Sequence, residues 1–148
     1  MNILVVGGGG REHAIAESLS KSPLTTRLVV APGNPGIKTI AECYPIAADD
    51  ISGQCKLARD IKADFVFIGP EIPLVLGLKD ELLKLGISAF GPSKKAAQLE
   101  GSKIFSRKFC KRHNIPQPKF KYCTDIETAK NQIELLNGYC VVKADGLA

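Results

Sequence analysis

Short apolar runs alternate with amphipathic stretches along residues 1–100 of the chain. Runs of β-branched residues, leucine and phenylalanine predict β-strands, because such residues suit the surface of a buried sheet. The predicted strands lie at 2–6, 27–30, 65–68 and 87–90. The run at 65–68 is apolar throughout, as is typical of a central parallel strand covered on both faces. A further piece at 43–47 contains Pro45, which has no backbone N–H, so we expect only an edge or irregular strand there.

Apolar residues at helical spacing predict helices between these strands. The predicted helices cover about 11–21, 51–61 and 74–85. Asp50 offers an N-cap to the second helix, and Gly86 follows the third where a glycine commonly ends a helix. The alternation of strands and helices predicts an α/β fold with a doubly wound, mostly parallel, Rossmann-like sheet.

The pattern changes after Phe90. Two short helices are predicted at about 93–99 and 104–109, followed by a strand at 119–123, a helix opened by a capping box of Thr124 and Glu127, and a strand at 139–143. The residues after 101 are too few to bury both apolar faces of an independent sheet. We therefore predict an N-terminal domain at 1–100 and the truncated beginning of a second domain at 101–148.

Four consecutive glycines, 7–10, connect the first predicted strand to the first helix. Glycines let a phosphate approach the backbone, and the free N–H groups of a helix start favour an anion, so the turn predicts a phosphate site. A dinucleotide site needs a third glycine where Glu12 stands, and an acid about 20 residues further on, which the strand at 27–30 lacks. A nicotinamide-dependent oxidoreductase domain, or a non-catalytic module on the same scaffold, stay open as alternatives.

Three unusual loops, at 7–12, 32–36 and 69–73, follow predicted parallel strands. Ligands of doubly wound sheets lie beyond the carboxyl ends of the strands, so we expect the loops to meet over one crevice. Glu71 is the acid best placed to accept hydrogen bonds from a ribose diol, although it could be only a helix-start acid. Arg11 and Glu12 could equally be solvated first-turn residues, and Asn34 a turn residue. The candidate substrate-binding residues are Gly9, Gly10, Arg11, Glu12, Asn34, Gly69, Glu71 and Pro73.

Composition narrows the classes of partner. The 20 lysines and arginines against 15 acids give a net charge of +5, with 6% aromatic residues, which favours small anions over a nucleic-acid groove. No apolar run is long enough to cross a bilayer, and we expect no membrane partner and a cytoplasmic location. The five cysteines include no C-x-x-C pair and no histidines at ligand spacing, so we expect free thiols and no metal site.

Six blocks of sequence resemble the glycinamide ribonucleotide synthetase family of purine biosynthesis. They are VVGGGGREH at 5–13, APGNPG at 31–36, GPEIPL at 69–74, FGP at 90–92, AAQLEGSK at 96–103 and VKADGLA at 142–148. The blocks occur in the same order and spacing as in the family, so the resemblance extends over the whole chain. The resemblance implies that residues 1–100 help to hold a phosphoribosyl substrate and that residues 101–148 begin an ATP-grasp domain.

The resemblance also implies an ATP-dependent ligase that joins glycine to 5-phosphoribosylamine through glycyl phosphate. Lys103 and Lys143 match lysines that contact the nucleotide phosphates, although surface lysine is the alternative, chiefly for Lys103. The expected cofactors are ATP with Mg²⁺ or Mn²⁺. The metal ligands and the catalytic residues are expected beyond Ala148, in the rest of the same polypeptide, so we expect this chain alone to have no ligase turnover.

Overall fold

The computed structural model describes residues 1–147, so Ala148, the last residue of the predicted second domain, lies outside them. The chain divides into two compact units, Met1–Ala97 and Gln98–Ala148. The division falls three residues before the boundary expected from the sequence.

The first unit is built on one five-stranded sheet in which every neighbouring pair is parallel, in the order β3-β2-β1-β4-β5. Its strands are β1 (Asn2–Gly7), β2 (Arg27–Pro32), β3 (Glu42–Cys43), β4 (Phe65–Ile68) and β5 (Ser88–Phe90). β1 lies in the centre, where Leu4 pairs with Val29 of β2 and with Val66 of β4. The expected strands at 2–6, 27–30, 65–68 and 87–90 are present, and the piece at 43–47 reduces to the short edge strand β3.

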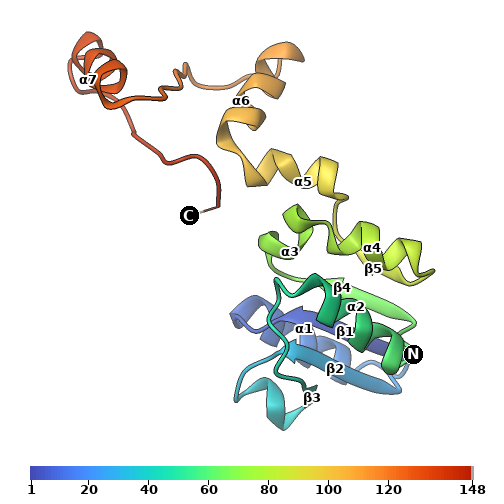
Figure 1. Ribbon diagram of the computed structural model, residues 1–148. Coiled ribbons are helices and arrows are strands. Elements are labelled where there is room, and N and C mark those ends of the chain that lie inside the picture. Colours follow the sequence, from blue (N-terminus) through green and yellow to red (C-terminus); the bar gives the residue numbers. More distant parts are fainter. Residues whose placement is uncertain (148) are drawn as a thin grey trace. The chain divides into compact units, whose positions relative to one another are not determined.

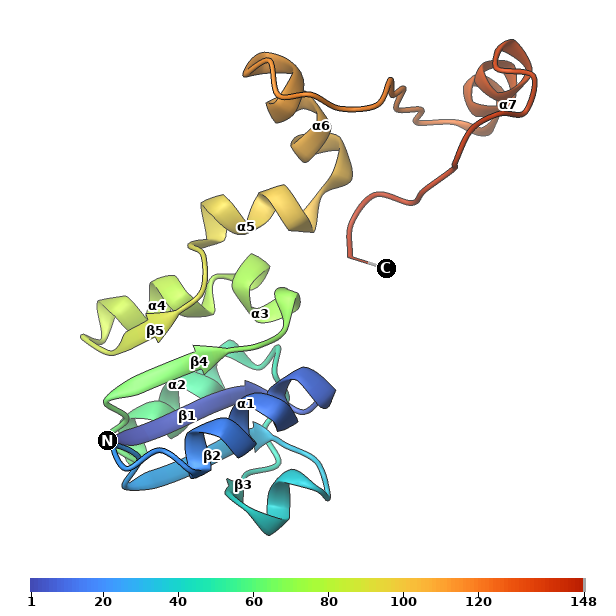
Figure 2. The same ribbon diagram turned by 180° about the vertical axis from the view of Figure 1, so that it is seen from behind.

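Helices cover both faces of this sheet, as Figures 1 and 2 show from opposite sides. They are α1 (Gly10–Ser20), the 3₁₀ turn η1 (Ile37–Thr39), α2 (Ile51–Asp60), α3 (Glu71–Leu76) and α4 (Leu78–Lys84). The next helix, α5 (Lys94–Gly101), contains the division between the two units. Leu4 and Val6 point to one face, where they pack with α2, α3 and α4, whereas Ile3 and Val5 point to the other, where they pack with α1 and η1. This period of two along β1 confirms the doubly wound α/β fold.

One helix expected from the sequence is broken in two. Gly77 stands between α3 and α4 with φ +102°, a left-handed conformation that glycine adopts without a steric penalty. Its N–H donates to the carbonyls of Pro73 and Leu74, which ends α3, and α4 then continues in a new direction. Leu78 and Leu82 of α4 are fully buried, so the break aims this helix into the core.

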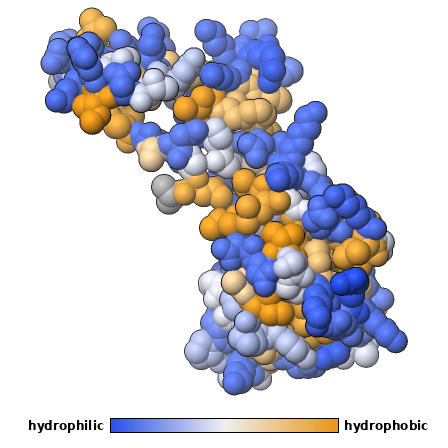
Figure 3. Space-filling model, viewed as in Figure 1, coloured by the Kyte–Doolittle hydropathy of each residue, from blue (hydrophilic) through white to orange (hydrophobic). Residues whose placement is uncertain are grey.

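The second unit contains α6 (Lys103–Arg112) and α7 (Ile126–Leu135). The strands predicted at 119–123 and 139–143 are wrong, because neither segment has strand structure in the described residues. An isolated extended segment has no neighbour to take its backbone hydrogen bonds. Val141 and Val142 are 80% and 73% exposed, and Figure 3 shows hydrophobic residues on the surface of this unit.

The start of α7 also differs from the expectation. Its N-cap is Asp125, whose carboxylate accepts from the Thr128 N–H at 2.7 Å, so the capping box predicted from Thr124 and Glu127 is wrong. An aspartate one residue later satisfies the same free N–H groups, and the helix begins there instead. None of the helices described is long and apolar enough to cross a membrane.

Candidate functional site

Three loops at the carboxyl ends of β1, β2 and β4 are joined by backbone hydrogen bonds. The Gly33 N–H donates to the Gly7 carbonyl at 3.1 Å, and the Gly69 N–H donates to the Val6 carbonyl at 3.1 Å. These bonds continue the pairing of neighbouring parallel strands past their ends. The structure therefore brings together the three loops that the sequence singled out.

Glu12 lies inside this junction and is only 5% exposed. Its carboxylate accepts the Gly9 N–H at 2.7 Å, so the acid bonds back across the first turn of its own helix. A Cβ on Gly69 would lie 2.5 Å from the Glu12 Cγ, and one on Gly7 would lie 2.7 Å from it. Glu12 thus fills the space beside two glycines and holds the turn in shape. Its carboxylate is committed to the protein backbone.

Gly8 shows a second close approach between loops. A Cβ at this position would collide with the carbonyl oxygen of Gly33, which belongs to the loop after β2. Gly10, the first residue of α1, has open space where its Cβ would be. The N–H groups of Gly10 and Arg11 lie in the first helical turn, which has no intrahelical acceptors, so they are free to bind an anion.

Arg11 and Glu71 form an ion pair above the loops, with 3.0 Å between Nη1 and Oε1. Arg11 also donates to the Gly69 carbonyl at 3.0 Å, which links α1 to the loop after β4. The two side chains are 62% and 42% exposed, so both remain accessible to a ligand. The hydrogen bond from Arg11 lowers the pKa of Glu71, which keeps Glu71 an ionised acceptor.

Asn34 and Pro73 stabilise the loops. The Asn34 amide donates to the Gly8 carbonyl at 2.9 Å, and its oxygen accepts from the Ile37 N–H at 2.9 Å. The Pro73 side chain is fully buried in the first turn of α3. Of the eight candidates, Arg11, Glu71 and the backbone at Gly10 therefore present the chemistry that a ligand could meet. The Gly9 backbone is already bonded to Glu12 and His13, and with Glu12, Asn34, Gly69 and Pro73 it shapes the loops.

The expected nucleotide lysines lie in the second unit. Lys103 is the first residue of α6, and its ammonium group donates to the Gly146 carbonyl. Lys143 is exposed, in an irregular segment close in sequence to Asp145. The Asp145 carboxylate accepts from Ser102 Oγ at 3.0 Å and from the Ile104 N–H at 3.1 Å. The bond from Ile104 lowers the pKa of Asp145.

Sequence reasoning missed two polar residues that fix other segments, Gln54 in the first unit and Asp145 in the second. Gln54 of α2 is fully buried, and its amide donates to the carbonyls of Ala47 at 3.0 Å and Ile46 at 3.3 Å, fixing the loop that follows β3. A polar residue among the apolar positions of an amphipathic helix was the available signal. Asp145 gave no local signal, because its partners lie more than forty positions earlier in the chain.

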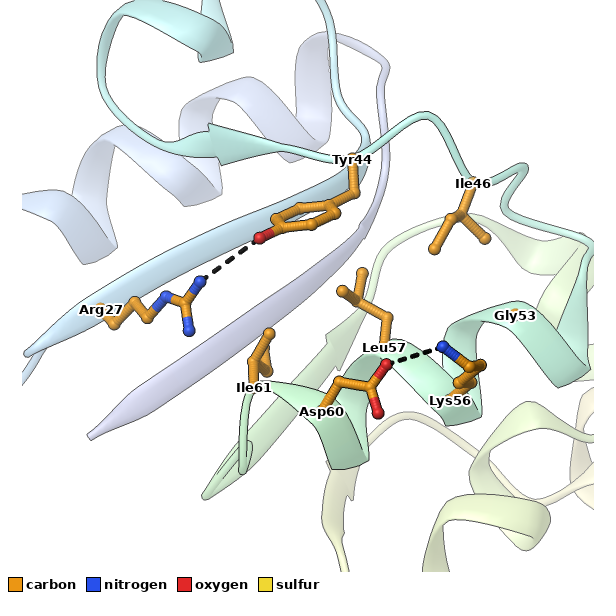
Figure 4. A pocket seen from close by; sticks show the side chains of 8 residues that line it. All are labelled: Arg27, Tyr44, Ile46, Gly53, Lys56, Leu57, Asp60 and Ile61. Atoms are coloured by element: carbon orange, nitrogen blue, oxygen red, sulfur yellow. Dashed lines mark hydrogen bonds and ion pairs between the residues drawn. The ribbon is translucent and has the colours of Figure 1, made fainter.

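Two surface hollows lie away from these loops. One of about 340 Å³ opens between β2, the segment after β3 and α2, and Figure 4 shows its lining side chains, with Arg27 and Lys56 bonded to Tyr44 and Asp60. The other, of about 470 Å³, lies between α2 and α4. The cations at the first hollow are already paired within the protein, since Arg27 also bonds Glu42 at 2.7 Å.

The described residues contain no cluster of side chains suited to binding a metal ion. Within residues 1–147, no group of three or more histidine, cysteine, aspartate or glutamate side chains is placed to hold a metal ion. The five cysteines are all free thiols. These residues therefore do not fit a divalent-cation site by themselves.

Comparison with protein families gives two matches that together span the chain. Residues 1–100 match the model for the phosphoribosylglycinamide synthetase N domain, and residues 101–148 match that for the phosphoribosylglycinamide synthetase ATP-grasp (A) domain. Phosphoribosylamine–glycine ligase of Caulobacter vibrioides is 48% identical over all 148 residues. A bifunctional purine biosynthetic protein of Dictyostelium discoideum is 47% identical over 99% of the chain, which covers 18% of that protein.

Two solved structures share the fold of this chain. The crystal structure of phosphoribosylamine–glycine ligase from Thermotoga maritima superimposes with a TM-score of 0.73, at 29% identity, over 99% of this chain and 34% of that one. N5-carboxyaminoimidazole ribonucleotide synthetase from the same organism has a TM-score of 0.67 at 20% identity, over 89% of this chain and 36% of that one, and so shares the fold. The chain spans 35% of the length of the Caulobacter relative.

Proposed function

Because this chain belongs to the phosphoribosylglycinamide synthetase family, we propose that it forms part of a cytoplasmic ATP-dependent ligase that joins glycine to 5-phosphoribosylamine in purine biosynthesis. ATP phosphorylates the glycine carboxylate, whose oxygen thereby becomes a phosphate leaving group. The amine of 5-phosphoribosylamine then attacks glycyl phosphate, and the products are glycinamide ribonucleotide, ADP and phosphate. A carboxylate is a poor electrophile until it is activated in this way.

The observation that carries the proposal is the set of groups at the junction of the three loops. The free N–H groups at Gly10 and Arg11, together with the Arg11 guanidinium, suit the phosphate of a phosphoribosyl compound. Glu71 beside them is an ionised acceptor that suits ribose hydroxyls. The proposed substrate site is therefore an anion-binding helix start with an acid at its edge.

The second unit supplies the proposed nucleotide contacts. Lys103 and Lys143 would bind the phosphates of ATP, because the compact positive charge of an ammonium group attracts phosphate oxygens. Mg²⁺ or Mn²⁺ would accompany ATP and offset charge on the transferred phosphoryl group. Its ligands would come from other parts of the ligase, since the described residues offer none.

The geometry also argues against the nicotinamide alternative. β2 ends at Pro32 without an acid, and the loop after it is held by Asn34, whose amide groups bond to Gly8 and Ile37. The buried Glu12 occupies the position of the third glycine of a dinucleotide turn. A ribose 2′-hydroxyl would find no carboxylate at the end of this strand.

Calorimetry on the complete polypeptide that carries this sequence tests the proposal. We expect saturable binding of glycinamide ribonucleotide and of ATP, no binding of NAD, and formation of ADP when glycine and fresh phosphoribosylamine are both present. Binding of NAD in place of glycinamide ribonucleotide would overturn the assignment of the substrate site. Binding of both ligands without ADP formation would overturn the ligase reaction.

A further inference from the structure

The segment that carries Lys143 is attached to the start of α6 through Asp145 and its neighbour. Asp145 accepts from Ser102 Oγ, at 3.0 Å to one oxygen and 3.2 Å to the other, and from the Ile104 N–H at 3.1 Å. Within residues 1–147, every hydrogen bond found for residues 141–147 involves Asp145 or Gly146. The placement of this irregular segment therefore depends on very few contacts.

Lys103 lies between the two residues that donate to Asp145. Ser102 precedes it and Ile104 follows it, so Asp145 holds the Ser102 hydroxyl on one side of this lysine and the Ile104 backbone N–H on the other. The Lys103 ammonium group itself donates to the carbonyl of Gly146, the residue after Asp145. A carbonyl oxygen and a phosphate oxygen are both hydrogen-bond acceptors, so the lysine can exchange one for the other.

The same contacts close the start of α6 to other anions. The Ile104 N–H is taken by Asp145, and the Phe105 N–H is taken by Ser102 Oγ at 3.0 Å. A helix start with free N–H groups attracts phosphate, but here a carboxylate of the protein already occupies it. A phosphate approaching this region would therefore be held by the lysine side chains instead of by the helix backbone.

We propose that Asp145 is a positioning residue for the nucleotide: it holds the Lys143 segment against the start of α6, so that the ammonium groups of Lys103 and Lys143 meet one phosphate chain. The carboxylate does not touch the nucleotide. When ATP binds, Lys103 exchanges the Gly146 carbonyl for a phosphate oxygen while Asp145 keeps its bonds to Ser102 and Ile104. This inference rests on the proposed function, because it assigns ATP to these lysines.

The test is steady-state kinetics with the complete ligase polypeptide and its Asp145→Ala variant. We expect the KM for ATP to rise roughly tenfold, the loss expected for a charge-assisted hydrogen bond, while the KM for glycine stays unchanged. Asp145→Asn keeps an oxygen acceptor and should restore most of the affinity for ATP. In a Lys103→Met background, Asp145→Ala should add little, because the two residues act through one contact.

Asp125→Ala is the matched control, since Asp125 caps α7 in the same unit with the same kind of bond. It should lower stability and leave the KM for ATP unchanged. An equal rise in the KM for ATP in Asp125→Ala, or no rise in Asp145→Ala, would overturn the inference.

If Asp145→Ala does not fold, Ser102→Ala replaces it. A rise in its KM for ATP is expected, and an unchanged value would contradict the inference. If the unaltered polypeptide does not bind ATP, the proposed function itself fails.

Discussion

The carboxylate of Glu12, a residue that is almost fully buried, accepts the backbone N–H of Gly9 at 2.7 Å. The acid stands where a dinucleotide-binding turn has its third glycine, and its side chain fills the space between the loops after β1 and β4. The glycine turn of this chain is therefore held by an internal carboxylate.

Glu12→Ala should destabilise the protein by about 1–3 kcal/mol, because the Gly9 N–H loses its acceptor and a packed side chain disappears. Urea unfolding followed by circular dichroism measures the change. Glu17→Ala serves as the control, since Glu17 is an exposed acid on the same helix paired with Lys21, and it should change the free energy of unfolding by less than about 1 kcal/mol. Equal effects of the two variants would show that Glu12 does not hold the turn.

Two glycines of the same turn should respond differently to alanine. In Gly8→Ala the new methyl group meets the Gly33 carbonyl, a backbone atom that cannot move without separating the loops, so we expect a loss of about 1–3 kcal/mol. Gly10→Ala places its methyl group in open space and should be within about 1 kcal/mol of the unaltered protein. Thermal unfolding of the two variants measures both effects. A tolerated Gly8→Ala would be inconsistent with the close approach of the two loops.

Glu71→Gln should weaken glycinamide ribonucleotide binding about tenfold to a hundredfold, the range expected when a hydrogen bond to a charged group is lost. ATP affinity should change much less, because Lys103 and Lys143 belong to the other unit. Glu42→Gln is the matched control: Glu42 is also a partly exposed acid paired with an arginine, Arg27, but lies on the edge strand β3. Calorimetric titrations of the three proteins with each ligand decide the outcome.

The stability of α7 should fall at acid pH when the carboxylate of its N-cap, Asp125, becomes protonated. Its hydrogen bond from the Thr128 N–H lowers the pKa of Asp125, so the ionised cap stabilises the folded helix at pH values above the ordinary range of a carboxyl group. That contribution is lost as the pH falls through the lowered pKa. An NMR titration of the Asp125 carboxyl carbon should show a midpoint below that of an unfolded peptide. A midpoint equal to or above that of the peptide would contradict the observed cap.

The cysteines should react with a thiol reagent at very different rates. Cys140 is exposed, whereas Cys55 is buried in α2, and burial raises the pKa of the Cys55 thiol. We expect Cys140 to be modified first and Cys55 only after unfolding, as followed by mass spectrometry of peptides at timed intervals. Early modification of Cys55 in the folded protein would show that α2 is not packed as described.

The sequence predicted what depends on local pattern and repeated pairing. The apolar runs at 2–6 and 65–68 identified strands because a buried parallel strand needs side chains that suit both faces. The break at Gly77 was missed because the apolar spacing continues across it, and only the packing of Leu78 and Leu82 requires a change of direction. The strands expected at 119–123 and 139–143 failed because strand structure depends on a neighbour that local sequence does not reveal.

For the candidate site too, the sequence predicted the features that follow from the order of the strands, but not those that depend on contacts between distant residues. That three loops would meet followed from the parallel order of strands, but which side chains face a ligand and which hold the loops depended on contacts between distant residues. Glu12 and Asn34 bond to backbone groups of neighbouring loops, and nothing in their immediate sequence distinguishes them from Arg11. Their roles as substrate ligands stay predictions, as do those of Gly9, Gly10, Arg11, Gly69, Glu71 and Pro73.

The central position of β1 bears on how the protein is made. β1 leaves the ribosome before β4, yet its pairing is complete only when β4, whose Val66 pairs with Leu4, has also emerged. Until then one edge of a strongly apolar strand has no partner, and such edges are prone to association with other chains. Translation of the intervening residues at about 5–20 per second leaves β1 half-paired for several seconds. This interval is when nascent-chain chaperones would have most to protect.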